Sequence, residues 1–218
     1  MLKLTGLGVA FALAVLAALG ASPAVAAKSK SPTCKRSKSS TVAENRSARV
    51  FTRRDARHGD PHGTALVGCW KKSGRARRLA DAFDDEYVTS AAFDLVRLRG
   101  RFVAFYGESV DVSCKADCPP GYESTKRHLQ RTDLRSGSGF RVTIAERPAD
   151  RLLLDAGGAI AWPVWQPHNQ IEIRVRDAAG ERAIDSGAIH PESLTLSRGG
   201  WLGWINDGGN PRWARLAH

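Results

Sequence analysis

The stretch LLLDAGGAIAW, residues 152–162, decides the fold, because two other parts of the chain follow the same pattern. Residues 93–106 read FDLVRLRGRFVAFY and residues 193–204 read SLTLSRGGWLGW. Self-similarity of this kind indicates a structural unit that recurs along the chain. Four columns agree when the three segments are aligned: Gly100, Gly157 and Gly199; Val103, Ile160 and Leu202; Ala104, Ala161 and Gly203; Phe105, Trp162 and Trp204.

Each copy has the pattern of a β-hairpin. The aligned glycine falls where a tight turn needs a positive φ, and the apolar residues that follow alternate as in a strand with one buried face. The small residue before the aromatic ring leaves room for a neighbouring sheet. We therefore predict that Phe105, Trp162 and Trp204 are buried at equivalent positions on the second strands of successive sheets.

Further hairpins are expected between these copies. Residues 128–144 and 171–184 each give two strand patterns around a turn that carries Asp and ends in Gly, and residues 65–79 form an upstream relative without the Asp. The aligned glycines are 42 residues apart in the last interval and 57 in the earlier one. We assign the surplus to an insertion at residues 108–122. Two hairpins in about 42 residues amount to four strands per unit, the size of a propeller blade.

In these features the chain resembles bacterial secreted β-propeller-repeat proteins, whose blades carry a Gly-turn hairpin ending in an Ala-Trp-like pair. The resemblance covers residues 64–217 and implies four-stranded blades, but it transfers no catalytic or ligand residues, because the matched positions are core and turn positions. The expected fold is all-β, a propeller-like stack of three to four small antiparallel sheets over residues 47–218. The units are too few for an ordinary closed ring, so we expect an open stack or a ring completed by self-association. The alternative is a β-sandwich of about a dozen strands.

The N-terminal region has the pattern of an export signal. Residues 1–27 begin with a single Lys3, continue with an apolar core and end at the small-residue site Ala24-Val25-Ala26, so cleavage there is expected, with no transmembrane anchor afterwards. Localisation is then secreted or extracytoplasmic, in the cell envelope. The chain has 218 residues, 42% of them hydrophobic, which excludes a disordered chain and a multi-span membrane protein.

Export into an oxidising compartment makes the four cysteines candidates for two disulfides. Three pairings are open. The short loop between Cys114 and Cys118, followed by Pro and Gly, favours a local bridge, which leaves Cys34 for Cys69. A zinc site at this loop lacks two further ligands.

Positive charge is concentrated near the N-terminus. Residues 28–80 hold 15 Lys and Arg against 3 Asp and Glu, whereas residues 81–218 hold 17 against 19. Residues 28–46 are rich in Lys and Ser, and we expect a basic disordered linker there. Anionic envelope polymers are its expected partners. Nucleic acid is not expected, because no aromatic residues are interleaved with the lysines.

Two loops are candidates for ligand binding. Trp165 is expected to be exposed at a hairpin tip beside His168, Asn169 and Gln170, an aromatic ring next to polar groups of the kind that holds sugars. Most of the other tryptophans in the C-terminal third are expected in the core. The loop with His58, Asp60 and His62 is a weak metal candidate, because nearby basic residues oppose a cation. No cofactor is expected.

No catalytic motif of recognised spacing is present, and no Gly-x-Ser-x-Gly turn occurs. We therefore expect an exported non-catalytic binding or scaffold module rather than an enzyme. A secreted hydrolase with a site assembled from blade loops is the alternative. Charged or nucleophilic side chains converging in one deep pocket would favour the hydrolase, and a flat surface rimmed by Trp would favour binding.

Overall fold

A computed structural model of the chain describes residue 34 and residues 37–56, 60–84, 89–111 and 124–218. These residues form an all-β structure of antiparallel sheets, with two single-turn 3₁₀ helices. The elements are β1 (Ser39–Glu44), β2 (Ala48–Arg54), β3 (Thr64–Trp70), β4 (Arg75–Asp84), β5 (Thr89–Arg99), β6 (Phe102–Asp111), β7 (Ser124–Asp133), β8 (Gly139–Ile144), β9 (Leu153–Leu154), β10 (Ile160–Gln166), η1 (Pro167–Asn169), β11 (Gln170–Asp177), β12 (Gly180–Gly187), η2 (Pro191–Ser193), β13 (Thr195–Leu196), β14 (Trp201–Ile205) and β15 (Pro211–Arg215).

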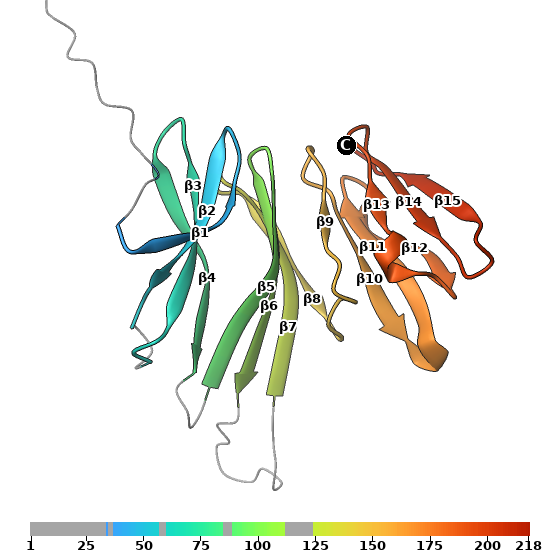
Figure 1. The fold of residues 1–218 in the computed structure, drawn as a ribbon, viewed down its shortest axis with the longest axis horizontal. Helices are drawn as coiled ribbons and strands as arrows, with labels where there is room; N and C mark the ends of the chain where they lie inside the picture. Colours follow the sequence, from blue (N-terminus) through green and yellow to red (C-terminus); the bar gives the residue numbers. More distant parts are fainter. Residues whose placement is uncertain (1–33, 35–36, 57–59, 85–88, 112–123) are drawn as a thin grey trace, which may run out of the picture. The chain divides into compact units, whose positions relative to one another are not determined.

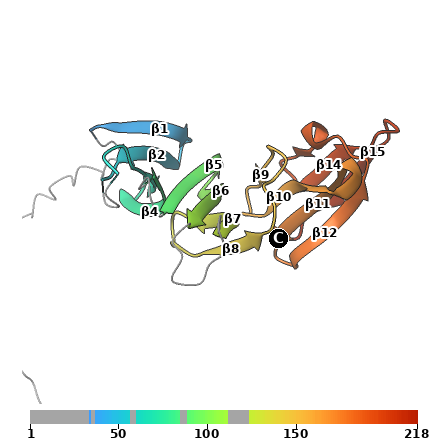
Figure 2. The ribbon, with the colours of Figure 1, turned by 90° about the horizontal axis from the view of Figure 1, so that it is seen from below.

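Neighbouring strands in the sequence are neighbours in the sheets. Strands β1–β8 form one eight-stranded sheet, β9–β12 a four-stranded sheet and β13–β15 a three-stranded sheet. Among the described residues, two residue pairs join β4 to β5, and we divide the eight-stranded sheet into two halves there. We refer to β1–β4, β5–β8, β9–β12 and β13–β15 as the first, second, third and last strand groups. They follow one another from blue to red in both views (Figures 1 and 2).

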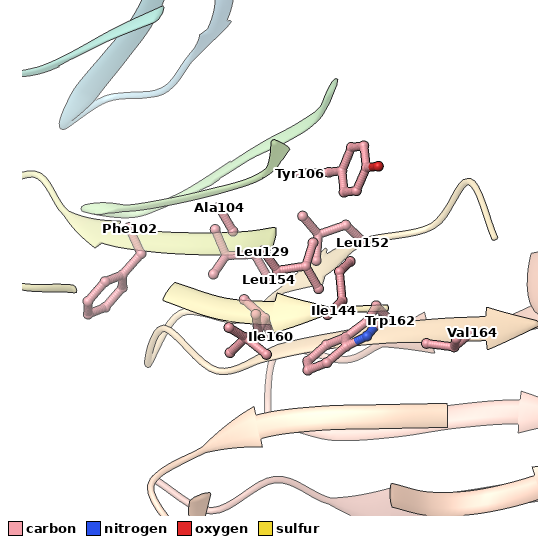
Figure 3. Packing of buried hydrophobic residues seen from close by; sticks show 11 residues of the cluster. Phe102, Ala104, Tyr106, Leu129, Ile144, Leu152, Leu154, Ile160, Trp162 and Val164 are labelled. Carbon is pink, nitrogen blue, oxygen red and sulfur yellow. The ribbon is translucent and has the colours of Figure 1, made fainter. Parts of the chain in front are cut away.

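The hydrophobic core consists of layers between consecutive strand groups. One cluster joins residues of β2–β4 to β6, a second joins β6–β8 to β9 and β10, and a third joins β10 and β11 to β14. Figure 3 shows the second cluster, which contains Phe102, Ala104, Tyr106, Leu129, Val142, Ile144, Leu152, Leu154, Ile160, Trp162 and Val164. Neighbouring strand groups therefore bury the apolar faces that they turn toward each other, as expected for stacked sheets.

The aligned aromatic column lies where the sequence predicts. Phe105, Trp162 and Trp204 lie on β6, β10 and β14, the second strand of each group, and are 0%, 0% and 4% exposed. Each ring packs into the cluster shared with the preceding group. Ala104 and Ala161 point the opposite way, into the cluster shared with the next group. The predicted burial of the three rings is confirmed.

The turn glycines differ from the prediction in two of the three copies. Gly100 has the expected positive φ of 56°. In the other copies the positive φ belongs to Gly158 (91°) and Gly200 (76°), the residues after the aligned Gly157 and Gly199. The alignment by sequence therefore placed the left-handed residue one position too early.

The cause is turn length. In the β5–β6 hairpin two residues separate the paired Arg99 and Phe102, and glycine comes first. The other turns hold three residues, closed by backbone hydrogen bonds from Asp155 to Ala159 (3.0 Å) and from Ser197 to Trp201 (2.9 Å). Three-residue hairpin loops place the left-handed residue last, which explains the shift.

The other predicted hairpins are present as β3–β4, β7–β8 and β11–β12. Two boundaries need correction. Residues 108–111, assigned to an insertion, continue β6 and pair with β7; residues 112–122 lie outside the described residues. Residues 39–44, assigned to a disordered linker, form β1. The low apolar content of this stretch predicts disorder. An edge strand, however, is held mainly by backbone hydrogen bonds, here to β2, and needs few apolar side chains.

A disulfide covers the outer face of the first strand group. Cys34 is bonded to Cys69, as the sequence analysis expects, while Cys114 and Cys118 lie outside the described residues. Cys34, Phe51, Ala65, Val67 and Cys69 form a small buried cluster. Because their neighbours in β2 and β3 face the second group, this cluster lies on the opposite face of the sheet.

We predict that Trp204→Ala and Trp162→Ala each lower the free energy of unfolding by roughly 3–5 kcal/mol, since each removes a large ring from a filled layer. Trp165→Ala is the matched control. Its ring is 46% exposed, so its loss is expected to change stability by less than about 1 kcal/mol. Urea unfolding followed by circular dichroism measures all three, and equal losses for Trp165 and Trp204 would contradict the layered core.

The Cys34–Cys69 bond closes a loop of 35 residues. We predict that the double variant Cys34→Ser, Cys69→Ser loses about 4 kcal/mol of stability, because the unfolded chain regains the entropy of the open loop. Chemical denaturation with and without reductant measures it. Reductant is expected to bring the wild-type protein to the level of the variant, and a wild type indifferent to reductant would refute the structural role of this bond.

His128 makes the second strand group sensitive to acid. Its ring meets Phe105 edge-on, with centroids 6.4 Å apart, and lies over Gly107. Burial lowers the pKa of His128 from 6.5 to about 4, and the nearby Arg141 acts in the same direction. The imidazole is therefore neutral in the folded protein at pH 6, while the unfolded chain already binds the proton.

Because the unfolded state binds more protons in this window, we predict that stability falls as the pH is lowered from about 6.5 to about 4. His128→Phe is expected to flatten this slope, whereas His168→Gln, at an exposed tip, is expected to leave it unchanged. Denaturation curves measured at several pH values test this. A slope that His128→Phe leaves intact would assign the acid sensitivity to another group.

Candidate functional site

Trp165 lies near the end of β10, on the strand face that also carries Ala161 and Pro163. Its indole is nearly half exposed. The segment before β9 runs beside this strand, since Pro148 bridges to Val164 and the amide of Ala149 donates to the carbonyl of Pro163 (3.0 Å). This backbone pairing places the following loop residues next to the indole.

A hollow of about 420 Å³ opens at this point. It is lined by residues from three separate parts of the chain, namely Ala149, Asp150, Arg151, Trp165, Pro191 and Glu192. The first three come from the segment before β9, Trp165 comes from β10, and the last two come from η2. One aromatic wall, one guanidinium and two carboxylates therefore border the same space.

Arg151 joins the two sides of the hollow. Its Nη2 donates a hydrogen bond to the backbone carbonyl of Glu192, so the segment before β9 is tied to η2. Its Nε is shielded from solvent and has no hydrogen-bond partner among the described residues. An unsatisfied N–H of this kind typically costs about 1–3 kcal/mol, which favours any rearrangement that supplies an acceptor.

The carboxylates at the hollow have weak, exposed partners. Asp150 lies 3.3 Å from Arg147 and has a side chain 85% exposed, and Glu192 lies 3.5 Å from the ring of His190. Asp150 also has a positive φ of 49°, a conformation that non-glycine residues rarely adopt. Both carboxylates are thus open to a ligand that offers hydroxyl or amino groups.

The polar residues predicted beside Trp165 do not line the hollow. His168 and Asn169 form the hairpin tip, both exposed and both with positive φ, at 63° and 59°. Gln170 pairs with Gln166 at the start of β11. Of the four predicted ligand residues, the structure brings only Trp165 to the hollow.

The candidate metal loop is only partly described, because His58 lies in the range 57–59, which is outside the described residues. The carboxylate of Asp60 accepts backbone hydrogen bonds from His62 (2.6 Å) and Asp84 (3.1 Å). The His62 bond is the main reason why the pKa of Asp60 is lowered. Asp60 therefore closes a turn, and no cluster of three metal-ligating side chains occurs in the described part of the chain.

A second hollow, of about 390 Å³, is lined by Ser90, Ala92, Phe93, Asp94, Tyr106, Glu108, Val110 and Arg147. Most of its charged and hydroxyl groups are already paired by hydrogen bonds or ion pairs within the protein. The hydroxyl of Tyr106 donates to Glu108, which Arg127 also contacts, and burial together with Glu108 raises the pKa of Tyr106 to about 12. Arg147 pairs with Asp94 at 2.7 Å. This internal pairing makes the second hollow the weaker candidate.

Sequence reasoning missed Arg151, Pro191 and Glu192 as site residues. They lie 14 to 27 positions from Trp165, in segments that carry no motif. One local signal was available: Pro191-Glu192-Ser193 has the composition of a helix start, which predicts a turn there but no ligand. The sequence could not supply the pairing of Pro148 with Val164, which brings these segments together.

Two comparisons add to this description. The chain matches no protein-family model, and no curated protein is significantly similar to it. Among the described residues, no helix is long and apolar enough to cross a membrane. The function must therefore be argued from the geometry of the chain itself.

Proposed function

We propose that the protein is an exported, non-catalytic binding or scaffold module of the cell envelope or extracellular space, and that its ligand is a glycan. The carrying observation is the solvent-facing indole of Trp165 in a hollow that also presents Arg151, Asp150 and Glu192. A sugar ring has an apolar C–H face and a rim of hydroxyls. An exposed indole beside a guanidinium and carboxylates matches both features.

The scaffold we propose is an open stack of propeller-like blades, with the β-sandwich as the alternative. Support comes from the up-and-down order of strands within each group and from the core layers between consecutive groups. The shared positions of Phe105, Trp162 and Trp204 add to it, because each ring packs toward the preceding group. In such a stack, loops at the edge of neighbouring blades meet, and the hollow at Trp165 is a meeting of this kind.

Export is proposed from the N-terminal pattern of residues 1–27 and agrees with the Cys34–Cys69 bond, since disulfides persist in oxidising compartments. The basic residues between 28 and 80 favour an anionic surface. They add a salt-dependent attraction to the glycan contact proposed at Trp165.

We predict that the protein sediments with at least one of three insoluble glycans, namely peptidoglycan, chitin and cellulose, and that Trp165→Ala lowers the affinity at least ~10-fold. The loss follows from removal of the stacking surface, because a buried aromatic contact commonly contributes 1.4 kcal/mol or more to binding. Arg151→Ala is expected to act in the same direction. The measurement is the bound fraction as a function of glycan concentration.

His168→Ala is the matched control, because it alters the same hairpin outside the hollow and is expected to bind as the wild type does. Repeating the assay in 0.5 M salt removes the attraction due to the basic segment and leaves the stacking contact. The proposal would be contradicted if the protein bound none of the three glycans, or if Trp165→Ala left the binding unchanged. Release of soluble sugar that is lost in Glu192→Gln would instead support the secreted hydrolase.

A further inference from the structure

The last strand group has an apolar outer face that the described residues leave uncovered. Leu202 and Trp204 on β14 point into the core layer shared with the third group, so Trp201, Gly203 and Ile205 point the other way. Trp201 is 49% exposed and Ile205 39% exposed. These values are high for large apolar side chains on a strand whose opposite face is buried.

Trp213 on β15 completes this face. It pairs with Gly203 across the β14–β15 ladder and is 66% exposed, the largest exposure among the large hydrophobic residues described. Its ring lies over the glycine: a Cβ added to Gly203 would approach two ring atoms to 2.7 Å. One side of the indole therefore rests on the sheet, and the other side faces solvent. We call Trp201, Ile205, Pro211, Trp213 and Arg215 the terminal face.

Gly203 is aligned with Ala104 and Ala161 in the sequence repeat. Comparison of the three positions shows that the terminal face lacks a following strand group. The two alanines are fully buried, because the next strand group packs on each of them. Gly203 is buried as well, but under the Trp213 ring of its own sheet, because no further strand group follows it among the described residues. The terminal face thus has the position and the composition of a surface on which another sheet packs.

The two ends of the stack differ in a way that selects the occupant. At the first group, the outer face is closed by the Cys34–Cys69 disulfide, and Phe51 below it is only 1% exposed. The guanidinium of Arg49 lies over that ring and donates to the carbonyl of Cys34. A head-to-tail stack of copies would need this closed face to receive the terminal face. Of the two end faces that the described residues form, the terminal face is the open apolar one, so its matching surface is the terminal face of a second copy.

We infer that two copies of the protein associate through their terminal faces, in a contact with two-fold symmetry. With the axis at Gly203 and Trp213, perpendicular to the strands, the two Trp213 rings stack on each other and Trp201 of each copy meets Ile205 of the other. The like charges separate in this arrangement. Arg215, which lies over the Trp201 ring, meets Pro211 of the other copy rather than a second arginine.

This inference is independent of glycan binding, since the hollow at Trp165 shares no residue with the terminal face. The test is sedimentation equilibrium of the purified protein over a range of concentrations. The wild type is expected to form a dimer. Trp213→Glu is expected to raise the dissociation constant at least ~100-fold, because each substitution occurs twice in a two-fold contact and places two carboxylates together.

Trp165→Glu is the control: it adds the same charge in place of another exposed indole and is expected to remain dimeric. Because Trp213 is exposed in the single chain, Trp213→Glu is expected to keep the wild-type circular dichroism spectrum, which separates lost association from lost folding. As a second readout, the quenching of tryptophan fluorescence by acrylamide is expected to decrease as the wild type dimerises and to be independent of concentration in Trp213→Glu.

Three results would overturn the inference. A wild type that stays monomeric at all concentrations, with freely quenched indoles, would show an open face with no second copy on it. A monomer whose indoles are protected at every concentration would show that residues of the same chain outside the described ranges cover the face. A dimer that Trp213→Glu leaves intact would place the contact elsewhere.

Discussion

The alternation of side chains on β6, β10 and β14 is the constraint on which the rest of the structure depends. Each of these strands sends a large ring to one side and a small residue to the other. The ring fills the layer toward the preceding strand group, and the small residue leaves space for the following one. Since a strand has only two faces, this one choice fixes the order in which the groups pack.

The candidate site follows from that packing. Trp165 is on the same strand as the buried Trp162, three residues further along, so the strand that fills the core also carries the exposed ring. The loops that complete the hollow come from the segment before β9 and from η2. They meet at Trp165 because the groups before and after the third sheet are held against it. The relative positions of the side chains that line the hollow are therefore fixed to the extent that the core layers are rigid.

The two outer faces of the stack show two ways of ending a series of sheets. At the first group, a disulfide and an arginine close the apolar face. At the last group, the apolar residues remain in contact with solvent in the single chain. Repeating architectures generally need polar terminal faces to stay soluble. The aromatic terminal face departs from this rule, as expected for a surface on which another protein surface packs.

The sequence by itself determined the strand pattern, the hairpin pairs and the burial of Phe105, Trp162 and Trp204, because these depend on local periodicity and turn residues. It favoured a bond between Cys34 and Cys69, as the pair left over by a local Cys114–Cys118 bridge, and the structure shows that bond. The tertiary structure decided which glycine takes the positive φ, since that depends on whether a turn holds two or three residues. It decided that residues 39–44 form an edge strand. It also decided that Trp201 and Trp213 lie outside the core, although most tryptophans of the C-terminal third were expected inside it. Exposure of a strand residue depends on whether another sheet follows, and that is a property of the assembled stack rather than of any local stretch of sequence.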